Sequence, residues 1–187
     1  MDGPLGIKLE NISFAMAKGS SLGIIGATGA GKTTIIKLLL RFYDPTDGVI
    51  LLNGKDIRTY NLKKYRNLFA TAFQDNRLFS MSVTDNVLMK ENVHTDEERE
   101  LAKSALELSG VYDKIMTLPH GMDTILTREF DEEGALLSGG ETQKIVVARA
   151  FAKKCPFKVF DEPSSALDPI AEYQLFENIT KSCRDNI

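Results

Sequence analysis

The chain has 187 residues, of which 43% are hydrophobic and 26% are charged, and this composition predicts one globular domain and excludes a largely disordered chain. The formal net charge of −3 provides no basic excess for a nucleic-acid backbone, so we expect no nucleic-acid partner. The most apolar stretch, residues 35–40, is interrupted by Lys37 and is far shorter than the roughly 20 residues of a membrane-spanning helix. Two cysteines without metal-ligand spacing, and no signal-peptide pattern, favour a reducing, cytosolic setting.

The first predicted element is a buried strand over residues 20–26, because a short apolar run ends there in glycine. A glycine-rich loop follows, and apolar residues at helical spacing predict a helix over residues 33–42. The loop consists of Gly26, Ala27, Thr28, Gly29, Ala30, Gly31, Lys32, Thr33 and Thr34. It fits the pattern G-x-x-x-x-G-K-[ST], and the order of strand, loop and helix is the one that a phosphate-binding loop (P-loop) requires.

The chemistry of this loop indicates that it binds a nucleotide together with Mg²⁺. Glycines let backbone N–H groups approach phosphate oxygens closely. We expect Lys32 to neutralise the β- and γ-phosphates and Thr33 to offer its hydroxyl to Mg²⁺. The helix that begins there directs its partial positive end at the same anion. The alternative, a glycine-rich turn without a ligand, is disfavoured by the motifs that follow.

Four further elements are predicted along the chain. Residues 48–57 hold an apolar run followed by Asn53-Gly54, a pair that favours the turn of an antiparallel hairpin. Acidic residues open a helical pattern over residues 96–110, which a glycine closes. An apolar strand is predicted over residues 156–160, and helical spacing returns over residues 171–179.

Two carboxylates, Asp161 and Glu162, follow the predicted strand directly, and ligands of parallel sheets bind at that edge. We expect Asp161 to hold Mg²⁺, directly or through water, and Glu162 to orient and deprotonate the water that attacks the γ-phosphate. Taken alone, a solvated Asp-Glu pair is the commoner interpretation, but its position after the P-loop favours catalysis. Glu162 and Lys32 are therefore candidate catalytic residues.

Residues 137–141 (LSGGE) precede a helical pattern over residues 142–150. Small residues at a helix N-terminus expose N–H groups, and with the hydroxyl of Ser138 they form a second anion site; the alternative is an ordinary capped amphipathic helix. The segment resembles the signature sequence of the ATP-binding cassette (ABC) family. The resemblance implies that this site serves the ATP held by the P-loop of a second subunit, so that two subunits enclose two nucleotides head to tail. The residues implied to bind ATP in this way are Ser138, Gly139, Gly140 and Glu141.

Two shorter segments also resemble motifs of the ABC family. Gln74 matches the Q-loop glutamine, which implies a contact with Mg²⁺, a catalytic role in sensing the attacking water and a link to a membrane domain. A match to the D-loop follows the carboxylates and implies contacts across the dimer interface. The residues of that match are Ser165, Ala166, Leu167 and Asp168.

The resemblance covers nearly the whole chain and is strongest to exporter-type ABC domains, which are fused to a six-helix membrane domain; residues 132–134 match the exporter X-loop. It implies an α/β fold: a P-loop NTPase core with a mainly parallel sheet, a small antiparallel β-subdomain and an inserted α-helical subdomain. One ABC ATPase domain is expected over residues 1–187, with the core over 1–75 and 137–187 and the helical subdomain over 76–136. The implied function is ATP hydrolysis that drives export at the cytoplasmic face of the cell membrane. The implied partners are ATP, a second ABC domain and a transmembrane domain.

Several features depart from the family pattern. No aromatic residue is a candidate for the A-loop that stacks on adenine, and the switch histidine of the family would lie beyond Ile187. We therefore expect a piece of a longer protein, trimmed at both ends, with low ATPase activity of its own. His94 and His120 are expected on the surface of the helical part. Glu141 replaces the usual signature glutamine, and Lys158 interrupts the predicted strand, where its amine is expected to reach an edge.

Two other functions stay open at this point. A soluble ABC ATPase that acts on DNA or ribosomes would carry coiled-coil insertions or basic arms, and the sequence has neither. A nucleotide-binding module with little turnover is the second alternative. Basic residues lie along the helical pattern that follows the signature segment and at its end. We interpret them as partners of the helix dipole rather than as a nucleic-acid site. These residues are Lys144, Arg149, Lys153 and Lys154.

Overall fold

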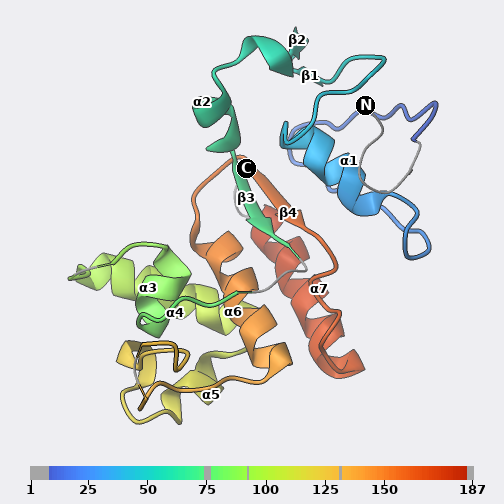
Figure 1. Ribbon diagram of the computed structural model, residues 1–187. Helices are drawn as coiled ribbons and strands as arrows, with labels where there is room; N and C mark the ends of the chain where they lie inside the picture. The colour runs from blue at the N-terminus through green and yellow to red at the C-terminus, as the bar shows by residue number, and fades with distance from the viewer. Residues whose placement is uncertain (1–8, 74–76, 92, 131, 185–187) are drawn as a thin grey trace.

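The computed structural model describes residues 9–73, 77–91, 93–130 and 132–184 (Figure 1). A long helix, α6 (Gly139–Ala152), lies at the centre of the molecule. Helices α3 (Val83–Leu88) and α4 (Asp96–Ser109) pack against α6, and α5 (Tyr112–Met116) follows α4 and contacts it. The remaining helices are α1 (Lys32–Leu39), α2 (Leu62–Arg66) and the C-terminal α7 (Pro169–Arg184), with short 3-10 turns at Ile57–Thr59 and Gly121–Asp123. No helix in these described ranges is long and apolar enough to cross a membrane.

Two strands from distant parts of the chain form a parallel pair. Strand β3 (Phe69–Ala72) pairs with β4 (Phe157–Phe160), with Phe69 opposite Phe157 and Ala72 opposite Phe160. The strand predicted over 156–160 is thus confirmed. Lys158 fits this half-buried strand because its amine lies 5.4 Å from the centre of the Phe151 ring. The pair places the carboxylates that follow β4 at the same edge as Phe73, which follows β3.

The antiparallel hairpin and one helix form as their local signals predict. Strands β1 (Leu51–Leu52) and β2 (Lys55–Asp56) pair antiparallel, and Asn53 and Gly54 between them have φ values of 52° and 75°, which suits a tight hairpin turn. Helix α4 begins with a capping box between Thr95 and Glu98 and ends at Gly110, whose φ is 72°. These contacts satisfy the free backbone groups at both ends of the helix.

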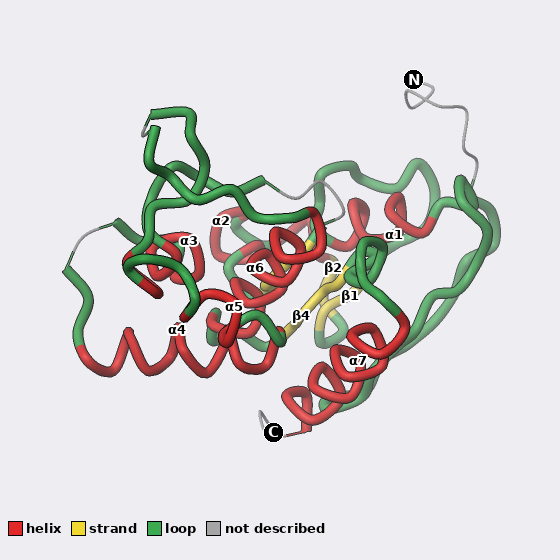
Figure 2. Tube along the Cα trace, turned by 90° about the horizontal axis from the view of Figure 1, so that it is seen from below, coloured by secondary structure: helices red, strands yellow, loops and turns green. Residues whose placement is uncertain are grey.

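The segment before the P-loop differs from its prediction. Residues 20–26 form no strand, and the side chain of Ile25 is 98% exposed; Figure 2 shows a long loop leading into α1. The prediction of a buried strand here is therefore wrong for this structure. An apolar run provides the side chains of a strand, but a strand also needs a neighbour for its backbone hydrogen bonds. The helix predicted over 33–42 forms as the shorter α1, over Lys32–Leu39.

The larger core surrounds α6, where Ile145 and Ala148 are fully buried against Leu106 of α4 and Val87 of α3. Arg149 of α6 reaches across this region. Its guanidinium donates to the backbone oxygen and side-chain Oδ1 of Asn86, both at 2.8 Å, and to the carbonyl of Arg77 at 2.9 Å. Burial lowers the pKa of Arg149 to about 10. Arg149 therefore joins the signature helix to the start of the helical part, a role beyond the helix dipole.

Replacing Arg149 by methionine is expected to lower the free energy of unfolding by about 3 kcal/mol, because the two acceptors on the buried Asn86 lose their charged donor. Urea unfolding followed by circular dichroism measures this change. The control is Lys181→Met on α7, whose exposed ion pair with Glu177 should contribute less than about 0.5 kcal/mol. Equal midpoints for the two variants would show that Arg149 is not a structural link.

Candidate nucleotide-binding site

The P-loop leads into α1 with the backbone geometry that an anion site needs. Gly29 and Gly31 have φ values of 81° and 95°, a region that side chains with a Cβ rarely adopt. Gly31 is the N-cap of α1 and provides no side-chain hydrogen bond to the first turn. The first N–H groups of α1 are therefore free of a side-chain cap and can donate to phosphate oxygens.

Lys32 connects the P-loop to the carboxylate at the end of β4. Its amine donates to the carbonyls of Gly26 at 3.0 Å and Ala27 at 3.2 Å, and it lies 3.2 Å from Oε1 of Glu162. The structure thus brings together the two residues that the sequence indicates for phosphate neutralisation and for water activation. The side chains of Lys32 and Glu162 are 18% and 37% exposed, so a nucleotide can reach both.

The backbone at Glu162 is unusual, because its φ of 50° lies in the left-handed region. That conformation costs a non-glycine residue energy and persists where neighbouring contacts hold it. The preceding residue, Asp161, is only 4% exposed, and its N–H donates to the carbonyl of Ala72 at 2.8 Å, which extends the β3–β4 ladder by one residue. The sheet therefore fixes the backbone of Asp161. At the turn that follows, the side chain of Glu162 points toward Lys32.

The oxygen ligands near the P-loop fit Mg²⁺. Thr33 offers a hydroxyl in the first turn of α1, and Asp161 offers a carboxylate at the end of β4. Magnesium commonly binds one or two protein oxygens and takes its other ligands from phosphates and water. The structure gives no direct contact between Thr33 and Asp161. Gln74, the third predicted magnesium ligand, lies outside the described residues.

The signature segment caps its own helix. The Ser138 hydroxyl accepts from the Glu141 N–H at 3.3 Å, while Oε2 of Glu141 accepts from the Ser138 N–H at 2.8 Å. Lys114 of α5 lies 3.6 Å from the other carboxylate oxygen. Burial alone would raise the pKa of Glu141, but the Ser138 hydrogen bonds and the Lys114 charge outweigh it and lower the pKa. The residue that departs from the family pattern thus completes a capping box.

The D-loop segment lies directly against the signature helix of the same chain. A Cβ added to Gly140 would lie 2.9 Å from the carbonyl oxygen of Ala166 and 3.6 Å from Cδ2 of Leu167. Asp168 caps α7, because its Oδ1 accepts from the N–H groups of Ile170 and Ala171 at 3.0 Å each, and these backbone hydrogen bonds lower the pKa of Asp168. The sequence motifs did not indicate this contact within one chain.

Replacing Gly140 by alanine is expected to cost about 1–3 kcal/mol of unfolding free energy, because the Ala166 carbonyl must move to admit the methyl group. The matched control is Gly139→Ala, since a Cβ there meets nothing within 4 Å, and we expect it to be as stable as the wild type or slightly more stable. Urea denaturation of both variants measures the difference. Equal stability of the two variants would contradict the close packing at Gly140.

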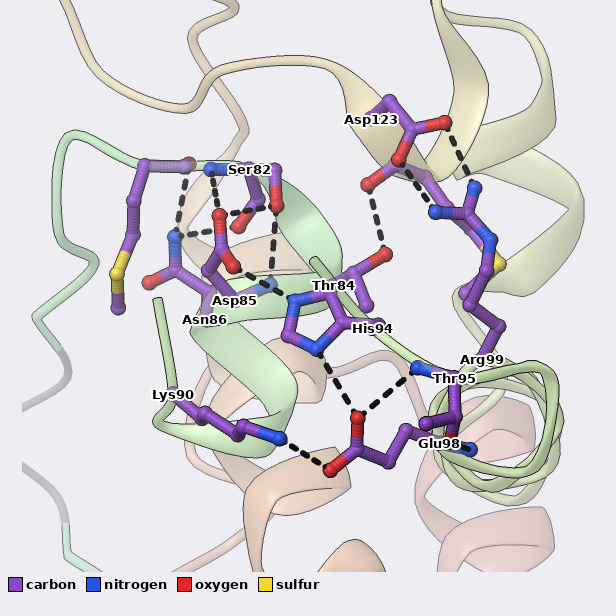
Figure 3. Close-up of polar contacts among 12 residues, drawn as sticks. Ser82, Thr84, Asp85, Asn86, Lys90, His94, Thr95, Glu98, Arg99 and Asp123 are labelled. Atoms are coloured by element: carbon purple, nitrogen blue, oxygen red, sulfur yellow. Dashed lines mark hydrogen bonds and ion pairs between the residues drawn. The ribbon is translucent and has the colours of Figure 1, made fainter. Parts of the chain in front are cut away.

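His94 lies inside the helical part, so the prediction of a surface position is wrong for this residue. Its side chain is 4% exposed, with Nε2 at 2.7 Å from Oδ1 of Asp85 and Nδ1 at 3.8 Å from Oε2 of Glu98 (Figure 3). Asp85 and Glu98 are the third residues of α3 and α4, and each completes the capping box at the start of its helix. The two helix starts face each other and enclose the ring. His120 is exposed, as predicted.

Together, a P-loop whose helix begins without a side-chain cap and a carboxylate within reach of the P-loop lysine define a nucleotide-binding domain of the P-loop class. The ABC transporter family matches this chain over residues 9–165. The chain belongs to the ABC transporter family.

Similarity to named transporters supports this family assignment. The chain is 39% identical over 177 residues to the mitochondrial iron-sulfur clusters transporter ATM1 of Kluyveromyces lactis, covering 95% of this chain and 24% of that protein. It is 41% identical over 165 residues to the beta-(1-->2)glucan export ATP-binding/permease protein NdvA of Brucella melitensis, covering 88% and 26%. A solved bacterial Atm1-family ABC exporter with ATP bound matches with a TM-score of 0.73 at 32% identity, over 84% of this chain and 27% of that one. The chain spans about a quarter of the length of these relatives.

Proposed function

We propose that this chain binds and hydrolyses Mg-ATP as the nucleotide-binding domain of an ABC exporter and that ATP-dependent dimerisation drives export. The observation that supports hydrolysis most directly is the 3.2 Å contact between the Lys32 amine and the Glu162 carboxylate. Hydrolysis needs a cation at the γ-phosphate and a base beside the attacking water, and phosphoryl transfer depends chiefly on such positioning. The two residues already share one site.

In the proposed reaction, the N–H groups of residues 26–34 would hold the phosphates, and the hydroxyl of Thr33 and the carboxylate of Asp161 would hold Mg²⁺. Mg²⁺ would neutralise charge on the phosphates during transfer. ATP competes for the Lys32 amine, which exchanges the carbonyls of Gly26 and Ala27 for phosphate oxygens. Glu162, released from Lys32, then orients the water and accepts its proton. Gln74 is proposed to sense this water.

A second subunit is proposed to complete each site. The N-terminus of α6 presents Ser138, Gly139, Gly140 and Glu141, and in a head-to-tail dimer this surface faces the ATP on the partner's P-loop. The residues proposed to lie across the dimer interface are Ser165, Ala166, Leu167 and Asp168. Within the chain we propose an ATP-binding core over 1–75 and 137–187 and a helical subdomain over 76–136.

The proposed partner for transport is a membrane domain that chooses the cargo, which places the chain at the cytoplasmic face of a membrane. The named cargoes of the relatives differ, since one is a transporter of iron-sulfur clusters and another exports a glucan. That difference favours a shared ATPase with separate determinants of cargo. The proposed rate of this chain alone is low, because each site is completed only when two chains meet.

Steady-state phosphate release by the chain in ATP, with Mg²⁺ or with EDTA, tests the proposed function. We expect Mg²⁺-dependent release whose rate per chain rises with protein concentration, because each site needs two subunits. A module without turnover would bind ATP and release no phosphate. A rate per chain that is independent of concentration would contradict shared sites.

A further inference from the structure

Gln143 is a buried polar residue of α6 for which the sequence motifs gave no role. Gln143 is 2% exposed, and both the nitrogen and the oxygen of its amide have hydrogen-bond partners. Nε2 donates to the backbone oxygen of Glu162 at 2.9 Å and to Oγ of Ser165 at 3.0 Å, and Oε1 accepts from the N–H of Ala166 at 2.9 Å. The Ala166 N–H can only donate, which fixes the orientation of the amide.

These hydrogen bonds hold the turn that carries the catalytic carboxylate. Glu162 has the left-handed φ of 50°, and such a conformation persists when its surroundings over-determine it. Its carbonyl accepts from Gln143 and also from the N–H of Ser165 at 3.2 Å. Gln143 therefore ties the backbone of Glu162 to α6, and the side chain beyond that backbone reaches Lys32.

The Gln143 amide also connects the signature helix with the turn that carries Glu162, and in the proposed dimer these two segments contact different ATP molecules. Gln143 lies one turn into the helix that begins with the signature residues, and Gly140 of that turn packs on Ala166. In the proposed dimer, the Glu162 side chain acts on the ATP held by the P-loop of its own chain, whereas the signature residues contact the ATP held by the partner. The buried amide of Gln143 is paired with Glu162, Ser165 and Ala166, and a buried amide paired in this way holds the segments that it joins in fixed positions.

We propose that Gln143 is a positioning residue for ATP hydrolysis, which holds Glu162 and the D-loop in fixed register with the signature helix. This inference rests on the proposed function, since it assigns Gln143 a role at the same site. Gln143 touches neither substrate nor Mg²⁺ and acts through Glu162. A purely structural role predicts a loss of stability with unchanged catalysis by the molecules that stay folded.

The first test does not depend on turnover. Amide hydrogen exchange, read residue by residue by NMR in the nucleotide-free chain, reports the Ala166 N–H directly. In Gln143→Met this amide should exchange at least about tenfold faster, because it loses its acceptor. The control is Gln174→Met, the same substitution at an exposed position of α7, which should leave Ala166 unchanged. Unchanged protection in Gln143→Met would overturn the inference.

The second test separates positioning from stability. Gln143→Glu keeps an acceptor for Ala166 but turns a carboxylate oxygen toward the Glu162 carbonyl, which loses the side-chain donor and keeps only the Ser165 N–H. At a temperature where each variant is folded, we expect kcat of Gln143→Glu and Gln143→Met to fall on the order of tenfold to a hundredfold, with the Kd for Mg-ATP within about twofold of the wild type.

The outcomes of the two tests are distinct. The positioning role would be refuted if both Gln143 variants hydrolysed ATP with the kcat of the wild type, provided that the wild type is active and Gln174→Met is unchanged. Loss of ATP affinity in parallel with kcat would also refute it, because it would indicate a general disturbance of the site. If the wild type released no phosphate, the proposed function would fail, and the Ala166 exchange rate would still decide whether Gln143 holds the turn.

Discussion

Replacing Glu162 by glutamine is expected to lower kcat for ATP hydrolysis by about a hundredfold to ten-thousandfold, the range that a positioned general base contributes. Glutamine keeps the size of the side chain and its capacity to orient a water, but it cannot take the proton. The carboxylate lies 3.2 Å from the Lys32 amine, so the substitution also removes an ion pair that ATP must displace. We therefore expect the Kd for Mg-ATP to stay equal or to fall.

Single-turnover and steady-state phosphate release, with isothermal titration of Mg-ATP, measure both quantities. Glu177→Gln is the matched control, because Glu177 lies on α7 and forms an exposed ion pair with Lys181. Its kcat should equal that of the wild type. A Glu162→Gln chain that turned over at more than about a tenth of the wild-type rate would exclude Glu162 as the base.

Replacing Lys32 by methionine is expected to weaken Mg-ATP binding by about tenfold to a hundredfold, since a charged hydrogen bond to phosphate contributes roughly 1.5–3 kcal/mol. Phosphate release should fall to background. The wild-type amine holds the carbonyls of Gly26 and Ala27, but the surroundings are partly exposed to solvent, so the loss of these hydrogen bonds should change stability little.

Isothermal titration calorimetry of Lys32→Met with Mg-ATP provides the binding constant, and thermal unfolding verifies the fold. The control is Lys37→Met in the last turn of the same helix, which should bind ATP as the wild type does. Equal affinity in Lys32→Met and Lys37→Met would mean that nucleotide is bound elsewhere.

The elements that the sequence predicted correctly are those with complete local signals. The hairpin at Asn53-Gly54 needs two residues with positive φ, and α4 has a capping box at one end and a glycine at the other. Strand β4 follows from an apolar run with a polar end. Residues 20–26 have the apolar run, but the position of a partner strand is not encoded in that run.

The contacts missed by sequence reasoning are those between segments distant along the chain. His94 is enclosed because two capping boxes face each other, and no single box signals that arrangement. In the sequence, Gln143 is an ordinary polar residue of a predicted helix. In the structure, its hydrogen-bond partners lie in the turn after β4. The motifs therefore indicated candidate residues for the chemistry, while tertiary packing determined which residues contact them.

Mixing two inactive variants tests the central claim, that each ATP site is built from two subunits, most directly. Lys32→Met damages the P-loop, and Gly139→Glu places a carboxylate in the open space at the start of α6, where it repels the partner's ATP while it suits the helix N-terminus. In a head-to-tail dimer, a mixed pair keeps one intact site, so an equal mixture should recover about a quarter of the wild-type phosphate release. Activity no greater than the sum of the two variants alone would contradict the account.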